Sequence, residues 1–544
     1  MSLLSCNVFA EPLARPNILI LMAEDMSDRV GAFGDEVAVT PNIDALAKQG
    51  VRYPNTFTAA GVCAPSRAAH ITGMHQISFG GQHMRTSGRP DGGYKAVPPP
   101  QVKAYPEQLR AAGYYTWTDS KLDYQFSGVR ANSGPFTIWD QEGSDGHWRN
   151  RQPGQPFYGL MNFNITHESG VFTPLGNWPH GVMHFIMQVM RAATLPSVPE
   201  GEPVAPADVV IPPYYPDTPT VRADIARHYN NIAVMDQQVG EILAQLEADG
   251  LADSTIVIWT TDHGDGLPRG KRDLFDLGIK VPMVIRWPEA YRPEGVAANG
   301  IDERLVSFVD FAPTILKLAG VSSPANLQGR DFVNDDPREY IYASRDRIDE
   351  VPDRQRAVRD DRYKYIRSWH PEQPGGHHLV YRDSMDMMLE LWEMLEAGEL
   401  DAAQRQWFEA PGEERLFDLQ ADPFELNNLA ADPVYNDTLL RMRAALASWQ
   451  GSIEDWSEQS EADMVAEFNP GGDVPVTAMP TVSFENGRLH LESATEGASM
   501  GYQINGGVWR VYSAPVKVTS GSEVLAKAVR YGWEESDTLM KSAP

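Results

Sequence analysis

A nearly unbroken apolar run at residues 17–22 (NILILM) leads almost directly into a pair of carboxylates, Glu24 and Asp25. A strand that is apolar along its whole length must be covered on both faces, which is typical of a parallel sheet flanked by helices. In open α/β sheets, ligands bind beyond the carboxyl ends of such strands. The run therefore predicts an α/β fold whose first strand delivers acidic side chains to a binding site.

The next part of the chain, to about residue 320, continues to alternate strands with helices. A helix is predicted at residues 41–48, with Thr40 as its N-cap and Gly50 as its end. A second helix is predicted at residues 220–246, where apolar residues recur about every 3.6 positions. This alternation favours a large, mostly parallel sheet with helices on both faces. The further strands predicted are residues 114–118, 157–163, 255–261 and 282–287.

The pattern changes after about residue 320. Short strands predicted at 340–343, 357–358 and 363–366, with helices at 384–395 and 436–449, indicate a smaller antiparallel subdomain. A linker rich in Pro and Gly at 470–475 precedes a tail with only strand and turn patterns, which predicts a separate β-sandwich. We therefore expect a leader or signal remnant at residues 1–14, a large α/β domain at 15–330, a subdomain at 331–468 and a β-sandwich at 475–544.

The charge balance excludes some partners. Acidic residues outnumber basic ones 74 to 46, so the 544-residue chain has a formal net charge of −28. Such a field repels nucleic acids and anionic membrane surfaces, and no apolar run approaches the ~20 residues of a transmembrane helix. An anionic substrate would therefore need a local basic pocket. The two cysteines, Cys6 and Cys63, are too few for a disulfide framework.

One motif carries most of the functional information: residues 63–67 (CAPSR), followed by 68–73 (AAHITG). It resembles the C-x-P-x-R signature of the formylglycine-dependent (type I) sulfatases, and four further segments agree with that family in order and spacing. Within the family, stretches between residues 209 and 240 are most similar to sulfamidase-like carbohydrate sulfatases. The tail resembles the small C-terminal β-sandwich of some chitobiase-type glycan enzymes. The four supporting segments are 15–25 (RPNILILMAED), 40–46 (TPNIDAL), 260–264 (TTDHG) and 416–429 (LFDLQADPFELNNL).

The resemblance implies an alkaline-phosphatase-like sandwich with a large, mostly parallel central sheet, an antiparallel C-terminal subdomain and the appended β-sandwich. It also implies that a formylglycine-generating or sulfatase-maturing enzyme oxidises Cys63 to 3-oxoalanine, which is formylglycine. The hydrate of this aldehyde carries two hydroxyls, of which one attacks sulfur while the other later loses its proton so that sulfate is expelled. A serine hydroxyl alone would form a sulfate ester with no internal route to breakdown.

A bound Ca²⁺ ion is also implied by the resemblance. Its ligands would be Glu24, Asp25, Asp262, His263 and the modified Cys63, which lie at predicted strand ends and in the motif. Carboxylate oxygens at this density suit a hard cation. The chain departs from the family at Glu24, where an aspartate is usual, and His263 stands where the family has Asn or His.

Several cations match family positions that handle the sulfate group. By resemblance, Arg67 holds the nucleophile and sulfate, and Lys121 binds sulfate. Lys271 shares protonation of the leaving oxygen with His167. The family commonly places a histidine two residues after the first lysine as the base for hydrate collapse, but this chain has Asp123 there.

Four residues are candidates for substrate binding. His83 either lines the substrate pocket or replaces Asp123 as the base, and Arg85 lies beside it. Arg345 and Arg347 follow a predicted strand, where they either grip a second anionic group or form ion pairs with nearby acidic residues.

These observations favour a hydrolase that removes sulfate ester groups from a sulfated polysaccharide or oligosaccharide and that is periplasmic or secreted. Three alternatives stay open: an N-sulfoglucosamine sulfamidase, a phosphonate or phosphodiester hydrolase on the same fold, and an inactive glycan-binding protein. The intact Cys63, Arg67, Lys121 and Lys271 argue against the inactive alternative.

Overall fold

The computed structural model describes residues 15–84, 86, 93–196, 198 and 203–544, and the expected leader at 1–14 lies outside them. The strands of its central sheet are β1 (Asn17–Ala23), β2 (Val51–Phe57), β3 (Tyr115–Thr118), β4 (Gln141–Glu142), β5 (Phe157–Phe163), β6 (Thr255–Thr261), β7 (Lys280–Arg286), β8 (Gly300–Ile301) and β9 (Val306–Ser307). They are ordered β4-β3-β5-β1-β6-β7-β2-β8, with β9 also paired to β2.

Most of the central sheet is parallel, as predicted. β1 lies inside it, with β5 and β6 parallel to it on either side. β7 runs antiparallel to both of its neighbours, β6 and β2. Sequence pattern does not reveal β2, because Pro54 interrupts it and the pairing with β7 shifts register between Tyr53 and Thr56.

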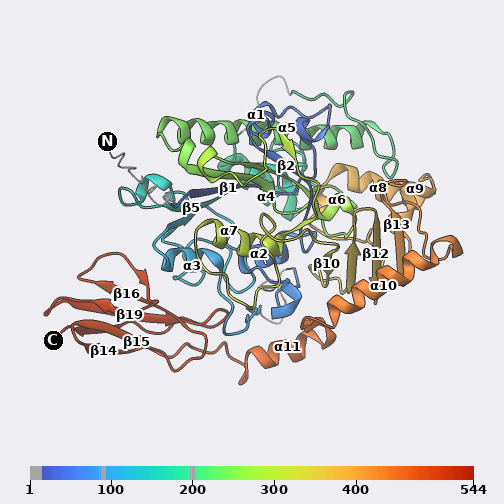
Figure 1. Cartoon of the computed structure of the whole chain (residues 1–544). Helices are drawn as coiled ribbons and strands as arrows, with labels where there is room; N and C mark the ends of the chain where they lie inside the picture. The colour runs from blue at the N-terminus through green and yellow to red at the C-terminus, as the bar shows by residue number, and fades with distance from the viewer. Residues whose placement is uncertain (1–14, 85, 87–92, 197, 199–202) are drawn as a thin grey trace, which may run out of the picture.

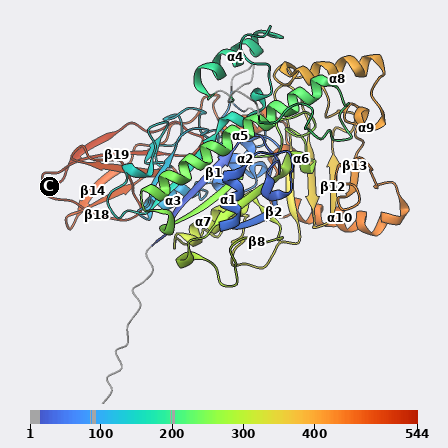
Figure 2. The ribbon, with the colours of Figure 1, turned by 90° about the horizontal axis from the view of Figure 1, so that it is seen from above.

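Helices cover both faces of this sheet (Figures 1 and 2). They are α1 (Pro41–Gln49), α2 (Cys63–Thr72), α3 (Tyr105–Ala111), α5 (Pro219–Ala248), α6 (Asp276–Ile279) and α7 (Phe311–Leu318). Alternate residues of β1 enter two cores, since Ile20 packs with α2, α3 and α7 and Leu21 packs with α1 and α5. This double burial explains why β1 is apolar throughout.

The N-terminus of α1 is capped in a different way from the one predicted. Thr40 occupies the N-cap position, but its side chain forms no capping bond, because its hydroxyl instead accepts from Gly31 N at 3.0 Å. The caps come from Asp236 of α5, whose carboxylate accepts from Ile43 N at 2.8 Å and from Asn42 N at 3.1 Å. A residue almost 200 positions away thus satisfies the first amide groups of the helix.

A second, four-stranded antiparallel sheet follows in the order β10-β11-β12-β13, which confirms the smaller antiparallel layer. Its helix α10 packs through Leu439, Met442 and Leu446 against Val358 and Tyr365 of the sheet. The elements are β10 (Ile341–Arg345), β11 (Gln355–Arg359), β12 (Tyr363–Ser368), β13 (Glu414–Asp418), α8 (Asp386–Ala397), α9 (Ala402–Arg405), α10 (Asn436–Gln450) and α11 (Glu461–Phe468).

The tail forms two antiparallel sheets with a small apolar core between them, and Figure 1 shows it beside α3. Buried Glu107 of α3 accepts hydrogen bonds from Ser499 Oγ at 2.5 Å and Tyr531 Oη at 2.7 Å, and Tyr531 also stacks on Phe126. The tail is therefore docked on the central domain. Its strands are β14 (Thr481–Glu485), β15 (Arg488–Glu492), β16 (Ser499–Ile504), β17 (Arg510–Val511), β18 (Val516–Lys517), β19 (Glu523–Val529) and β20 (Leu539–Ser542).

Helix α4 (Val182–Thr194) was not predicted and projects from the body of the molecule (Figure 2). Several of its apolar side chains, among them Val182, Phe185 and Met190, are exposed. Among the described residues, no helix is long and apolar enough to cross a membrane.

Candidate active site

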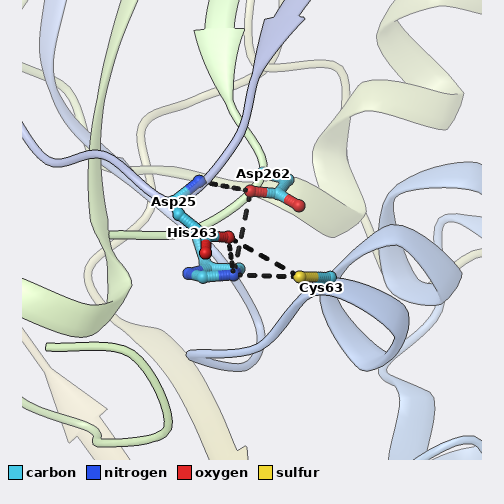
Figure 3. Close-up of side chains that lie close together, drawn as sticks. All are labelled: Asp25, Cys63, Asp262 and His263. Carbon is cyan, nitrogen blue, oxygen red and sulfur yellow. Dashed lines mark hydrogen bonds and ion pairs between the residues drawn. The ribbon is translucent and has the colours of Figure 1, made fainter. Parts of the chain in front are cut away.

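Two strand ends and one helix start meet at a single buried point (Figure 3). Asp25 follows β1, Asp262 and His263 follow β6, and Cys63 is the first residue of α2. The Cys63 Sγ lies 3.3 Å from His263 Nε2 and 3.7 Å from Asp25 Oδ1. His263 Nε2 is in turn 2.9 Å from Asp25 Oδ1. The structure therefore brings together four of the five sequence-predicted metal ligands.

The fifth residue, Glu24, is fully buried beside them and has one unsatisfied oxygen. Its Oε1 contacts Lys121 Nζ at 3.0 Å and Arg67 Nη2 at 3.5 Å. Its Oε2 is buried and has no hydrogen-bond partner among the described residues. A buried carboxylate oxygen without a partner is costly, so a cation at this position would remove a defect of the site.

The donor set fits a hard cation. One donor atom each from Asp25, Cys63, Asp262 and His263 lies within 4.8 Å of the others, and Glu24 forms a second such group with Asp25 and with His167. The carboxylate oxygens suit Ca²⁺, whereas the thiol of Cys63 is a soft ligand. Formylglycine formation would replace that sulfur with oxygen, which leaves the nitrogen of His263 as the one donor of this set that is not an oxygen.

The backbone is held in strained conformations around these ligands. Asp25 has a φ of 51° and Lys121 a φ of 56°, values that are rare outside glycine. Asp25 is fixed from several sides, because its N–H donates to Asp262 Oδ1 at 3.1 Å and its Oδ2 accepts from Glu168 N at 2.7 Å. Such strain persists only where surrounding contacts enforce it, as they do here.

Buried cations surround the carboxylates. Arg67 donates from Nε to Asp262 Oδ2 at 3.0 Å and from Nη1 to Asn162 Oδ1 at 2.5 Å. Lys271 Nζ donates to Asp25 Oδ2 at 2.6 Å and lies 3.3 Å from His167 Nε2. Together with Lys121 they place positive charge beside Cys63 in a chain that is strongly negative overall.

This packing shifts the protonation equilibria of the site. Burial favours the neutral form of Asp25, but Lys271, His167 and His263 together outweigh it and hold the pKa of Asp25 well below its usual value. For Glu24, burial prevails and raises the pKa despite the nearby cations. Burial would lower the pKa of His263, but the carboxylates of Asp262 and Asp25 raise it to about 10. The carboxylates therefore stabilise positive charge between them.

The predicted substrate-binding residues that the structure describes contact acidic side chains, and they do not line the cavity that opens from the site. Arg345 pairs with Asp273 and with Asp353, and Arg347 binds Glu461 through Nε at 2.7 Å and Nη2 at 2.8 Å. His83 Nε2 is 3.8 Å from the same Glu461. Arg85 lies outside the described residues. Asp123 is partly buried, and neither it nor His83 lines that cavity in the described structure.

A cavity of about 620 Å³ opens from this cluster. Glu24, Lys121, His167 and Lys271 lie at its inner end, and α4 forms part of its wall. Sequence reasoning identified these inner residues but not several others. Glu168 directly follows the predicted His167 and Asn162 lies in the same segment, so both were within reach, whereas α4 carries no motif that marks it as a cavity wall. Among the wall residues missed are Glu168, Ser169, Met183, Met187, Met190, Arg191, Arg272, Leu379, Val380 and Tyr381.

Comparison with known proteins places this site in a family. The sulfatase family model matches residues 16–321, and the model for the C-terminal part of N-sulphoglucosamine sulphohydrolase matches residues 269–387. An ulvan-active sulfatase of Formosa agariphila is 41% identical over 97% of this chain and 91% of its own length. Human N-sulphoglucosamine sulphohydrolase is 26% identical over 81% of this chain and 91% of its own.

Solved structures agree with this result at the level of the fold. The structure of a 2-O GAG sulfatase covers 82% of this chain and 94% of its own at a TM-score of 0.57 and 20% identity. This likeness and the observed sheets confirm the fold class expected from the sequence. With its motif, its buried cluster and these relatives, the chain belongs to the sulfatase family of sulfuric ester hydrolases.

Proposed function

We propose that this sulfatase hydrolyses sulfate esters of a sulfated polysaccharide or oligosaccharide. The observation that carries the proposal is the group of three cations beside Cys63: Arg67 and Lys271 are buried, Lys121 is half-buried, and the two lysines line an open cavity. Three cations can spread over the oxygens of one sulfate group, while the cavity is large enough for sugar rings. Relatives named for ulvan and for GAG support a carbohydrate substrate.

The proposed nucleophile is formylglycine at Cys63, whose hydrate supplies one hydroxyl to sulfur and a second for the later release of sulfate. Glu24, Asp25, Asp262 and His263 would hold Ca²⁺, which supplies positive charge to the reacting oxygens when bound. Burial of these residues excludes water from the reacting group.

The chain's own cations have separate tasks in this proposal. Arg67 is fixed by Asp262 and Asn162, so its guanidinium is already oriented toward the nucleophile. Lys121 binds a sulfate oxygen. Lys271 and His167 are 3.3 Å apart in the cavity, where they protonate the oxygen of the departing sugar.

Mass spectrometry of the Cys63 peptide, combined with sulfate release from a panel of sulfated glycans, tests this function. Conversion of thiol to aldehyde lowers the peptide mass by about 18 Da, and sulfate should be released by the same preparation. An unmodified thiol in protein made with an active maturation enzyme would contradict the mechanism. An aldehyde with no sulfate release from any glycan would favour a phosphorus substrate.

The base for hydrate collapse can be found in the same experiment. A variant without this base should accumulate a sulfated enzyme, about 80 Da heavier on the Cys63 peptide. Asp123→Ala and His83→Ala are the two candidates. Accumulation of the sulfated enzyme in one variant alone would assign that residue as the base. Accumulation in neither variant would exclude both residues from this role.

Sulfamate cleavage is a second candidate function, because residues 269–387 match the C-terminal model of N-sulphoglucosamine sulphohydrolase. Parallel assays with N-sulfoglucosamine and with O-sulfated oligosaccharides separate the two. Sulfate release from the N-sulfated sugar alone would contradict the sulfate ester proposal and assign the protein as a sulfamidase.

We further propose that the enzyme works outside the cytoplasm, because a large sulfated polysaccharide does not enter it. Fractionation of the native host by osmotic shock should release the protein with periplasmic or secreted material. Recovery only with cytosolic markers would contradict export.

A further inference from the structure

The wall of the cavity contains two cations that the proposed chemistry does not use, Arg272 and Arg191, and Arg191 is the one without a carboxylate partner in the described structure. Arg191 lies on α4 and is partly buried at the cavity surface. Its Nη1 donates to Ser169 Oγ at 3.2 Å, and its Nη2 donates to the carbonyl oxygen of Ile165 at 2.9 Å. Both partners are neutral.

The other cavity cations differ from Arg191 because each already has a carboxylate. Lys121 pairs with Glu24, and Lys271 pairs with Asp25. Arg272 binds Glu168 through both terminal nitrogens. By contrast, no carboxylate in the described part of the chain forms an ion pair with Arg191. Burial also lowers the pKa of Arg191 to about 10, and the more distant Tyr381, Glu24 and Asp25 offset this only in part.

Arg191 is close to the reacting end of the cavity. Ser169 Oγ, which accepts its hydrogen bond, lies 3.0 Å from His167 Nδ1. The opposite ring nitrogen of His167 contacts Lys271. Gly170 permits this close packing, since a Cβ there would lie 2.6 Å from Asn231 Nδ2 and 2.8 Å from Arg191 Nη2.

We propose that Arg191 binds a second anionic group of the substrate, a carboxylate or another sulfate, on the sugar that carries the scissile sulfate or on its neighbour. A guanidinium can donate two parallel hydrogen bonds to either group. Arg345 and Arg347, which sequence alone suggested for this task, are held in ion pairs. The inference rests on the proposed function, since it concerns the same cavity.

Matched substrates test this role: a sulfated oligosaccharide with a uronate carboxylate, its carboxyl-reduced form, and a disulfated neutral analogue. Loss of a charge-assisted contact in Arg191→Met should lower kcat/KM for the preferred anionic substrate about 10- to 100-fold. The effect should lie mainly in KM, and the carboxyl-reduced substrate should be cleaved as by the wild type. Arg191→Lys keeps the positive charge but cannot donate two parallel hydrogen bonds, so its kcat/KM should fall less than that of Arg191→Met.

The control is Arg227→Met. Arg227 also anchors this segment, by donating to the carbonyl oxygen of Val171, but it does not line the cavity. It should affect all three substrates equally. An equal loss for all three in Arg191→Met would show that Arg191 only supports the fold, and would overturn the inference.

The two kinds of anion are distinguished by the substrate whose kcat/KM falls in Arg191→Met. A fall for the uronate substrate assigns a carboxylate to Arg191, and a fall for the disulfated substrate assigns a second sulfate. Wild-type enzyme that cleaves none of the three would instead contradict the proposed function. Wild-type enzyme that cleaves all three equally would contradict the inference alone.

Discussion

Glu24 is a buried carboxylate with one oxygen paired to Lys121 and the other without a partner in the described structure. No donor in the described structure reaches this second oxygen. A divalent cation is the simplest completion, and it would stabilise the folded state by mass action.

We expect Glu24→Gln to weaken Ca²⁺ binding at least about tenfold, because affinity depends on the charge of the ligand set. Thermal unfolding with added CaCl₂ or EDTA measures this without any activity assay. Wild-type protein should gain a higher Tm from Ca²⁺, and the variant should gain little. Glu458→Gln, at an exposed side chain, is the control. An unchanged Ca²⁺ response in Glu24→Gln would remove this residue from the ligand set.

His70 lies in an aromatic environment formed by Tyr105, Phe308 and Phe311, and its Nε2 has no partner among the described residues. Burial lowers the pKa of His70 from 6.5 to about 3. Below pH 6.5 His70 is therefore protonated in the unfolded chain but stays neutral in the folded chain. The free energy of unfolding falls as the pH drops.

His70→Leu should reduce the loss of unfolding free energy between pH 7 and pH 5 by about 2 kcal/mol. Urea unfolding at the two pH values gives this difference independently of any packing change at pH 7. His378→Leu, at an exposed ring, serves as the control. An equal pH dependence in His70→Leu and wild type would refute the assignment.

The site could be predicted from sequence wherever the chemistry lies at the end of a strand or in a short motif. Asp25, Cys63 and Asp262 converge because parallel strands end at one edge of a sheet. The partners of Arg345 and Arg347 could not be predicted, because Asp273 and Glu461 are distant in sequence and meet them only through tertiary packing.

At the scale of elements, α1 depends on a carboxylate of α5. Asp236→Ala should destabilise the protein by about 1–3 kcal/mol, because the amides of Asn42 and Ile43 would lose their acceptor in a largely buried place. Chemical denaturation measures the change. Asp253→Ala, at an exposed position, should have almost no effect. A similarly small effect at Asp236 would mean that water replaces the cap.

Strands and helices with a strong apolar period were predicted closely, as β5 and β6 show by agreeing with 157–163 and 255–261. α4 was not predicted although residues 182–194 (VMHFIMQVMRAAT) repeat apolar side chains at helical spacing. Most of these side chains face the cavity and solvent, and only Met187 packs against a core. Similarly, Thr40 occupies the N-cap position as its residue type predicts, but the distant carboxylate of Asp236 accepts the hydrogen bonds of the first helix amides.

At the scale of the whole molecule, the β-sandwich is bound to the central domain through a buried acid. Glu107 accepts from Thr137 of its own domain and from Ser499 and Tyr531 of the tail. These contacts join the two units within a single buried network, so we expect them to unfold together.

Tyr531→Phe should cost about 1–3 kcal/mol, because Glu107 loses a donor that water cannot easily replace. Differential scanning calorimetry should show a single transition for wild type and a lower Tm for the variant. Tyr512→Phe, within the sandwich, is the control. Two separate transitions in the wild type, with Tyr531→Phe shifting neither, would show that the tail folds independently.

The burial of Cys63 also has a consequence in time. Cys63 is only 3% exposed, so the proposed maturation enzyme would have no access to its thiol in the finished fold. The proposed modification would therefore have to happen before the chain closes, during or soon after synthesis. The fraction of active molecules in a preparation would then depend on the rate of modification relative to the rate of folding. Adding the maturation enzyme to folded protein would not raise that fraction.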